Sequence, residues 1–257
     1  MCSNPQSAPP IEPAPAGAAG HSRILEARDG TRVSAFEADA VAPTGAGIIV
    51  LPDYYGLTPF YERLALRFAE AGVDAIAVDY YARTAEPPPR DLSFDHRDHA
   101  DRTTWSGLEM DVSAAASEIR RRRNLSALFS IGFCFGGRVS FLLATMPGLE
   151  LSGVVGFYGW PVGPYGNGMA APASVSSDLR APLLAIFGGA DQKIPRADVA
   201  TFEAALDAAG ADHRVLTYEG APHSFFDRQS EGHAEAAASA WAEVLGFLRL
   251  PRDASGG

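Results

Sequence analysis

The chain has 257 residues, of which 47% are hydrophobic, so it is long enough to bury a substantial core in one α/β domain. Its formal net charge is -10, from 21 Lys and Arg against 31 Asp and Glu, and it has no Lys/Arg-rich cluster, which argues against nucleic-acid binding. The one basic run, Arg120 to Arg123, closes a predicted helix, where cations favour the negative end of the helix dipole. We therefore interpret it as a helix end rather than a phosphate-binding site.

The two cysteines, Cys2 and Cys134, indicate a reducing compartment. Cys2 lies in a segment rich in Ser, Pro, Ala and Gly, and a disulfide from there to the core would stabilise little. Residues 1–20 have neither the apolar nor the basic region of a signal peptide, and no apolar stretch is long enough to span a bilayer. We expect a cytoplasmic protein without a membrane partner.

The domain plan follows from composition. The first twenty residues carry proline at five positions and should form a disordered tail. A single α/β domain is predicted over residues 21–250, followed by a short C-terminal tail at 251–257.

Continuous apolar runs alternate with segments whose apolar residues recur every third or fourth position. Strand, helix, strand in this rhythm is typical of right-handed βαβ units and a parallel sheet. Residues 84–104 and 159–178 have no such period, so we expect two irregular segments over the ligand crevice. In chain order, the patterns predict strands at 32–36 and 47–51, a helix from Pro59 to just before Gly72 with Thr58 as N-cap, a strand at 73–78, a helix at 104–122, a strand at 125–131, a helix through 139–144, strands at 153–158 and 183–187, a helix at 198–209, a strand at 213–218 and a helix at 232–250.

Residues 132–137 read Gly-Phe-Cys-Phe-Gly-Gly and join a predicted strand to a predicted helix. This is the pattern of a nucleophile elbow with sulfur in place of the usual serine oxygen, and it puts Cys134 on the bend. The glycines let neighbouring backbone approach the turn closely. Cys134 is thus a candidate nucleophile, although a lone cysteine after a strand can also be a small buried hydrophobic residue.

Two further polar residues follow predicted strands: Asp191 and His223. The carboxyl ends of parallel strands meet at one edge of the sheet, so these residues can meet Cys134 there. The order nucleophile, acid, histidine is that of an α/β-hydrolase triad. In it Cys134 attacks as thiolate, His223 moves protons and Asp191 orients the imidazole. Taken singly, Asp191 could be a turn residue and His223 a structural histidine.

Backbone N–H groups should stabilise the oxyanion of such a reaction. The N–H of Phe135 lies at the start of the helix after the elbow, and the second donor should be the N–H of Tyr54, in the loop after the strand at 47–51. A plain turn is the alternative interpretation of that loop.

Five motifs together resemble the dienelactone hydrolase family, in order over about residues 21–250. The resemblance implies an α/β-hydrolase fold with a mostly parallel sheet of about eight strands and helices on both faces. It also implies hydrolysis of a small lactone or activated ester through an acyl-thioester, without a cofactor. The motifs are residues 51–56 (Leu-Pro-Asp-Tyr-Tyr-Gly), 79–83 (Asp-Tyr-Tyr-Ala-Arg), 132–137, 189–191 (Gly-Ala-Asp) and 222–225 (Pro-His-Ser-Phe).

The resemblance also implies roles for polar residues near the triad. Asp53 matches an acidic family residue, usually glutamate, that contacts the nucleophile and gates the thiol; a turn residue is the alternative. Arg83 matches an arginine that holds the substrate carboxylate, a task suited to the guanidinium fork; a surface arginine is the alternative. The second family arginine falls at Asp227, with Arg228 one place later. An acid there would repel a carboxylate substrate, which leaves activity on dienelactone itself open.

Residues 95–101 (Asp-His-Arg-Asp-His-Ala-Asp) hold two histidines three positions apart, but no matching third ligand accompanies them. We interpret this stretch as a solvated face and predict no metal site. Two other functions stay open: a general carboxylesterase, and a hydrolase-fold protein that binds a small acidic metabolite or partner without turnover. The pattern does not decide between a monomer and a homodimer.

Overall fold

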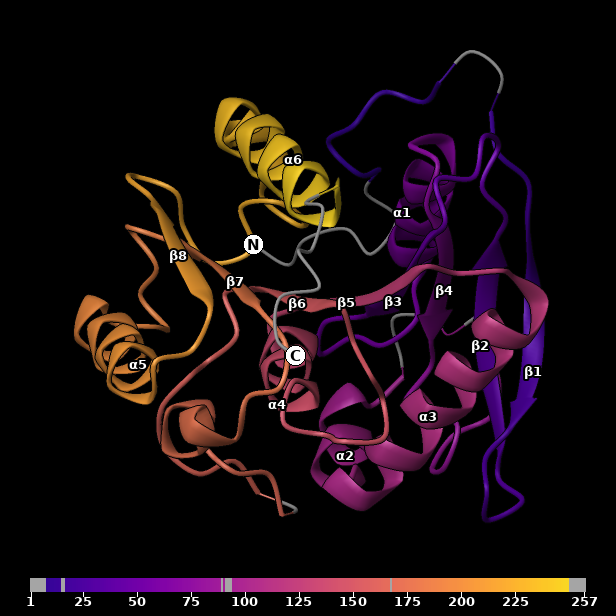
Figure 1. The fold of residues 1–257 in the computed structure, drawn as a ribbon, viewed down its shortest axis with the longest axis horizontal. Coiled ribbons are helices and arrows are strands. Elements are labelled where there is room, and N and C mark those ends of the chain that lie inside the picture. Colours follow the sequence, from indigo (N-terminus) through magenta and orange to yellow (C-terminus); the bar gives the residue numbers. More distant parts are fainter. Residues whose placement is uncertain (1–7, 15–16, 89, 91–93, 167, 250–257) are drawn as a thin grey trace, which may run out of the picture.

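The computed structural model describes residues 8–14, 17–88, 90, 94–166 and 168–249. These residues form one mixed eight-stranded sheet in the order β1-β2-β4-β3-β5-β6-β7-β8. Helices α1 and α6 cover one face of the sheet, and α3 and α4 cover the other (Figure 1). The α/β fold predicted from the alternating pattern is confirmed. The strands are β1 (Gly20–Glu26), β2 (Arg32–Ala38), β3 (Ala46–Leu51), β4 (Asp74–Val78), β5 (Ala127–Phe133), β6 (Gly153–Phe157), β7 (Leu183–Gly188) and β8 (His213–Tyr218).

Most strands of the sheet are parallel, and most of the central ones are fully buried. β1 pairs antiparallel with β2, and β2 pairs antiparallel with β4, while all other neighbours are parallel. Every residue of β3, β4, β6 and β7 is buried, as expected for strands covered by helices on both faces. Because the strands from β3 to β8 that neighbour one another run parallel, the carboxyl ends of β3, β5, β7 and β8 lie along one edge of the sheet, where the site is built.

The helices are α1 (Pro59–Glu70), α2 (His96–Arg102), α3 (Trp105–Arg122), α4 (Phe135–Leu143), α5 (Arg196–Ala209) and α6 (Ala234–Arg249). Helix α1 begins where predicted, with Thr58 at the N-cap position, but the Thr58 side chain makes no capping hydrogen bond. Pro59 at the first position already fixes the helical φ there. By contrast, the Thr104 hydroxyl caps α3 by accepting from the Gly107 N–H at 3.2 Å.

The two segments without a sequence period differ from each other. Residues 96–102 form α2, which was not predicted, because a seven-residue helix is too short to show a period. Asp95 starts it by accepting hydrogen bonds from the N–H groups of Arg97 and Asp98. In the second segment the described residues include a Tyr165–Met169 β-bridge and the 3-10 turn η1 (Pro172–Asp178). A short turn η2 (Ser230–Gly232) precedes α6. Strand β1 was also missed.

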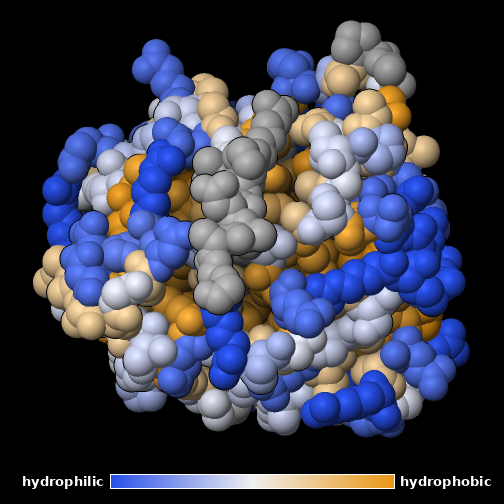
Figure 2. All heavy atoms as spheres, in the orientation of Figure 1, coloured by the Kyte–Doolittle hydropathy of each residue, from blue (hydrophilic) through white to orange (hydrophobic). Residues whose placement is uncertain are grey.

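The basic run at the end of α3 is used in ion pairs within the fold. Arg122 pairs with Glu37, and Arg123 with Asp74 at 3.2 Å, which agrees with its interpretation as a helix end. Figure 2 shows hydrophilic side chains gathered where the C-terminal end of α3 meets β1 and β2. No helix in the described part of the chain is long and apolar enough to cross a membrane.

Part of the predicted N-terminal tail lies against α1. Pro9 is buried, and the N–H of Ala14 donates to Glu70 at 3.0 Å. Residues 1–7, 15–16 and 250–257 lie outside the described residues, so the predicted tails, 1–20 and 251–257, and the domain boundaries they set remain predictions.

Candidate active site

Cys134 occupies a strained turn between β5 and α4. Its φ is 53° and its ψ is -111°, a conformation that costs energy for any residue with a side chain. A Cβ on Gly132 would lie 1.9 Å from the Gly136 carbonyl oxygen, and one on Gly136 would lie 2.3 Å from the Leu51 carbonyl oxygen. Only glycine fits at these two positions, and the resulting turn presents the half-buried Cys134 side chain at the edge of the sheet.

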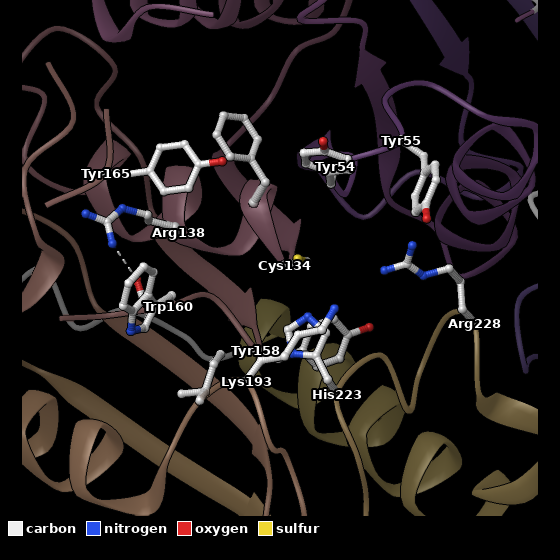
Figure 3. A pocket seen from close by; sticks show the side chains of 12 residues that line it. Tyr54, Tyr55, Cys134, Arg138, Tyr158, Trp160, Tyr165, Lys193, His223 and Arg228 are labelled. Carbon is white, nitrogen blue, oxygen red and sulfur yellow. Dashed lines mark hydrogen bonds between the residues drawn. The ribbon is translucent and has the colours of Figure 1, made fainter. Parts of the chain in front are cut away.

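His223 and Asp191 form a buried pair beside this turn. Figure 3 shows His223 on the cavity side of that pair, next to Cys134. His223 Nδ1 lies 2.7 Å from Asp191 Oδ2. The other carboxylate oxygen of Asp191 accepts from the N–H groups of Lys193 at 2.7 Å and Ile194 at 3.1 Å, so the acid is held on both sides. His223 Nε2 has no well-aligned hydrogen bond to a described residue, although the Cys134 sulfur is near enough to act on the imidazole.

The contact between His223 and Asp191 shifts the pKa of both groups. Burial alone would lower the pKa of His223, but the Asp191 hydrogen bond and the Cys134 sulfur raise the pKa more strongly, to about 9. Burial would raise the pKa of Asp191, yet the hydrogen bond and charge of His223 bring it below its usual value. The raised pKa of His223 favours the protonated imidazole at neutral pH.

Two backbone N–H groups near Cys134 make no hydrogen bond to a described residue. Phe135 is the first residue of α4, so its N–H has no partner within the helix. The Tyr54 N–H likewise bonds to none of the described residues. The Tyr54 loop is held by two hydroxyls: Tyr80 donates to the Pro52 carbonyl at 2.5 Å and Tyr81 to the Tyr54 carbonyl at 2.5 Å. The sequence motif at 79–83 contained both tyrosines, but nothing in it indicated this role.

Asp53 is held by Arg228 and by the Tyr55 backbone. Its Oδ2 is 3.3 Å from Arg228 Nη2, and its Oδ1 accepts from the Tyr55 N–H at 2.9 Å. Within the described residues no hydrogen bond joins Asp53 to Cys134. Burial raises the pKa of Asp53 to about 6, although the positive charge of Arg228 opposes that rise.

The Arg228 guanidinium points into the site. It stacks 4.6 Å over the Tyr55 ring, bonds to Ser224 Oγ at 3.1 Å and points toward Cys134 (Figure 3). Asp227 instead turns into the core, where it accepts from the Tyr61 hydroxyl at 3.4 Å. The acid at the family arginine's position therefore does not face the cavity, and the arginine one residue later does.

Arg83 is placed outside the site, contrary to the expectation from the resemblance. Its Nη2 lies 2.7 Å from Asp111 and its Nη1 lies 2.6 Å from Asp29. Asp111, on α3, is buried, so it needs a cationic partner, and Arg83 supplies it. Arg83 is not among the residues that line the cavity.

The side chains around Cys134 enclose a cavity of about 390 Å³. Half of its lining residues are aromatic, and Cys134 lies near the middle of the lining (Figure 3). Sequence reasoning missed the lining from the irregular segment after β6, which has no readable pattern. The lining residues are Tyr54, Tyr55, Cys134, Phe135, Arg138, Tyr158, Trp160, Tyr165, Lys193, Ile194, His223 and Arg228.

The histidines of α2 take part in ring contacts. The His99 ring stacks on Phe94 at 4.4 Å, and the His96 ring meets the edge of Tyr55 at 4.7 Å. No group of three or more potential metal ligands occurs among the described residues. α2 thus packs behind one wall of the cavity, through Tyr55.

Comparison with known proteins identifies the family. Residues 33–250 match the model of the dienelactone hydrolase family. A Rhodococcus opacus carboxymethylenebutenolidase is 29% identical to this chain, and the match covers 96% of each chain. An Escherichia coli K12 protein, provisionally named carboxymethylenebutenolidase, is 30% identical, and the match covers 79% of this chain and 76% of that protein. A Klebsiella pneumoniae crystal structure, provisionally named dienelactone hydrolase, is 27% identical with a TM-score of 0.81, covering 91% of this chain and 99% of that one. The chain therefore belongs to the dienelactone hydrolase family, and it is a hydrolase of lactones or carboxylic esters.

Proposed function

We propose that this protein hydrolyses a lactone or an activated enol or aryl ester through a Cys134-His223-Asp191 triad and an acyl-thioester intermediate. The observation that carries the proposal is the placement of Cys134. It sits in a strained turn at the start of α4, inside a cavity, beside a histidine whose other nitrogen is 2.7 Å from a buried carboxylate. A cysteine kept only for packing needs neither the turn nor the charged pair.

In the first half of the reaction the Cys134 thiolate attacks the substrate carbonyl. The N–H groups of Phe135 and Tyr54 stabilise the oxyanion that forms. The tetrahedral intermediate then collapses, the carbon–oxygen bond to the leaving group breaks, and the His223 imidazolium gives that oxygen its proton. The products are the acyl-thioester and an alcohol or enol, which stays attached when the substrate is a lactone.

In the second half His223, now neutral, removes a proton from water as the water attacks the thioester. Asp191 stabilises the imidazolium that results. The oxyanion again binds to the two N–H groups, and its collapse releases the acid and restores the Cys134 thiolate. Because a thiolate works only in reduced form, we place this activity in the cytoplasm.

The leaving group separates this function from general carboxylesterase activity. A thiolate is itself a good leaving group, so a tetrahedral intermediate with a poor alcohol expels the thiolate and returns to substrate. Enols, phenols and strained lactones avoid that outcome. The aromatic cavity also suits planar groups, and the guanidinium of Arg228 suits an anionic one.

The test combines substitution with trapping of the intermediate. Cys134→Ala should lower kcat on phenyl acetate by about 10³-fold or more, whereas Cys2→Ser, the matched change at the other cysteine, should leave kcat as it was. Acid quenching during turnover should show one acetyl adduct at Cys134 by mass spectrometry. Full activity of Cys134→Ala, or no adduct under conditions of rapid turnover, would disprove the mechanism. A panel of lactone, aryl ester and alkyl ester separates it from a general carboxylesterase.

A further inference from the structure

One side of the cavity is built from aromatic rings that come from different parts of the chain. We name it the aromatic lobe and define it as Phe135, Trp160 and Tyr165. Trp160 and Tyr165 lie on the opposite side of Cys134 from Tyr55 and Arg228 (Figure 3). The Phe135 and Tyr165 ring centroids are 5.5 Å apart, and Trp160 is 41% exposed at the rim of the cavity.

The Arg138 side chain holds the backbone of the segment that carries Trp160 and Tyr165. Its Nη1 donates to the Trp160 carbonyl at 2.9 Å, and its Nη2 donates to the carbonyls of Gly163 at 2.8 Å and Ala170 at 2.6 Å. The guanidinium also lies 5.7 Å from the Tyr165 ring centroid. Arg138 thus ties together the irregular segment that carries two of the three aromatic residues.

Arg138 is also joined to the nucleophile. It lies in the first turn of α4, where its own N–H donates to the Cys134 carbonyl at 3.1 Å. The lobe is held from its outer side too, because Trp160 Nε1 donates to Asp198 at 3.1 Å. The Arg138 side chain therefore links the lobe to the helix that begins just after Cys134.

The arginine is costly to keep in this place. It is 1% exposed, it pairs with no carboxylate in the described part of the chain, and its Nε has no hydrogen-bond partner there. Burial lowers its pKa to about 10, so it is still charged at neutral pH. Burying a cation whose polar contacts are backbone carbonyls costs free energy, and an apolar side chain of the same volume would not carry that cost. The position of this buried cation beside the nucleophile points to a function in the site.

We propose that Arg138 is a positioning residue that holds the aromatic lobe open for a planar aromatic or conjugated group of the substrate. This inference rests on the proposed function, since the bound group is part of an ester cleaved at Cys134. Arg138 does not touch the reacting atoms; it acts through Trp160 and Tyr165. Flat rings in offset or edge contact with a planar ligand favour it over a small flexible one.

Two esters with the same acyl group test the proposal. Phenyl acetate and vinyl acetate both give the acetyl-thioester, so deacylation is common to them and only the leaving group differs. Arg138→Met, which keeps an unbranched apolar stem, should lower kcat/KM for phenyl acetate about tenfold and leave that for vinyl acetate within about twofold. Trp160→Leu should shift the ratio in the same direction. Equal losses on both esters, or an unchanged ratio, would overturn the proposal.

A matched control is Arg120→Met. Arg120 also donates to two loop carbonyls, those of Leu149 at 2.5 Å and Glu150 at 3.1 Å, but it lies away from the cavity. Its substitution should leave the kcat/KM ratio of the two esters unchanged. If Arg138→Met fails to fold, as judged by its thermal transition, Tyr165→Leu and Trp160→Leu carry the same test.

Binding without turnover separates this inference from the mechanism. In the Cys134→Ala background, the Kd of phenyl acetate, followed by tryptophan fluorescence, should rise about tenfold when Arg138→Met is added. A rise in Kd supports the proposed role of Arg138 and the aromatic lobe in binding, even if the thiol mechanism is wrong. An unchanged Kd overturns the proposed role of Arg138, even if Cys134 is the nucleophile.

Discussion

The buried hydrogen bond between Asp191 and His223 can be tested by the nearly isosteric change Asp191→Asn. The Asn carbonyl oxygen can still accept from the N–H groups of Lys193 and Ile194, which now bond to Asp191 Oδ1. The Asn NH₂ group would then face His223 Nδ1, in place of the carboxylate oxygen at 2.7 Å. The imidazole would lose its negative partner and would be held in the opposite tautomer.

The expected loss can be scaled from the pKa of His223. The rise from 6.5 to about 9 corresponds to about 3 kcal/mol in favour of the imidazolium, and Asp191 and Cys134 supply it against the effect of burial. Removal of the carboxylate should lower the pKa by at least about one unit and thus weaken the thiolate-imidazolium pair. Together with the wrong tautomer, we expect a loss of about 10² to 10⁴-fold in kcat.

Two assays measure this loss: hydrolysis of phenyl acetate, and the rate at which iodoacetamide alkylates Cys134 at pH 7. Both should fall in Asp191→Asn, while the thermal transition still shows a folded protein. The control is Asp207→Asn, because Asp207 lies 3.6 Å from His213 in a second, surface Asp-His pair. If Asp191→Asn keeps both rates within about threefold of the native protein, the assigned role of Asp191 is wrong.

Three other outcomes are expected. Arg83→Met should lower the free energy of unfolding, measured in urea, by about 3–5 kcal/mol, because it leaves Asp111 buried without its cation. The KM for a carboxylate-bearing ester should not change. A raised KM would show that Arg83 contacts the substrate. In the proposed mechanism the His223 imidazolium protonates the leaving group, and the pKa of His223 is raised to about 9. The value of kcat/KM should therefore fall as the pH rises through about 9, and a flat profile from pH 8 to 10.5 would contradict this role. Burial raises the folded-state pKa of Asp53 from 3.8 to about 6, so its ionisation destabilises the fold progressively from about pH 4 and fully above about pH 6. Asp53→Asn should therefore raise the unfolding free energy by about 3 kcal/mol at pH 7.5, with a gain near zero below pH 4, and a constant gain would refute the shifted pKa.

Much of the fold could be predicted because the buried strands are continuous apolar runs. β8 occupies the predicted residues 213–218, and β3, β4 and β7 differ from their predicted ranges by one residue at one end. The misses have a common cause. β1 is a partly exposed edge strand, and α2 is a seven-residue helix, so neither carries a long hydrophobic period.

Part of the candidate site could be predicted from the sequence, and part could not. Cys134, Asp191 and His223 could be placed together in advance because each follows a strand of a parallel sheet. The arginines could not be placed, because the direction of a loop side chain depends on partners far away in sequence. Arg83 is drawn to Asp111 on α3, whereas Arg228 is held by Asp53 and Tyr55 from the loop after β3.

The amino-acid sequence alone determined the layered α/β architecture, the glycine-framed turn at Cys134 and the order of the three polar residues along it. These features depend on local geometry and on the rule that parallel strands end at one edge. The tertiary structure alone decided which guanidinium enters the cavity and what lines it. Asp227 packs against Tyr61, Arg228 faces Cys134, and buried Arg138 holds the segment that carries Trp160. Such choices depend on which buried charge finds a partner, and only the packed chain determines that.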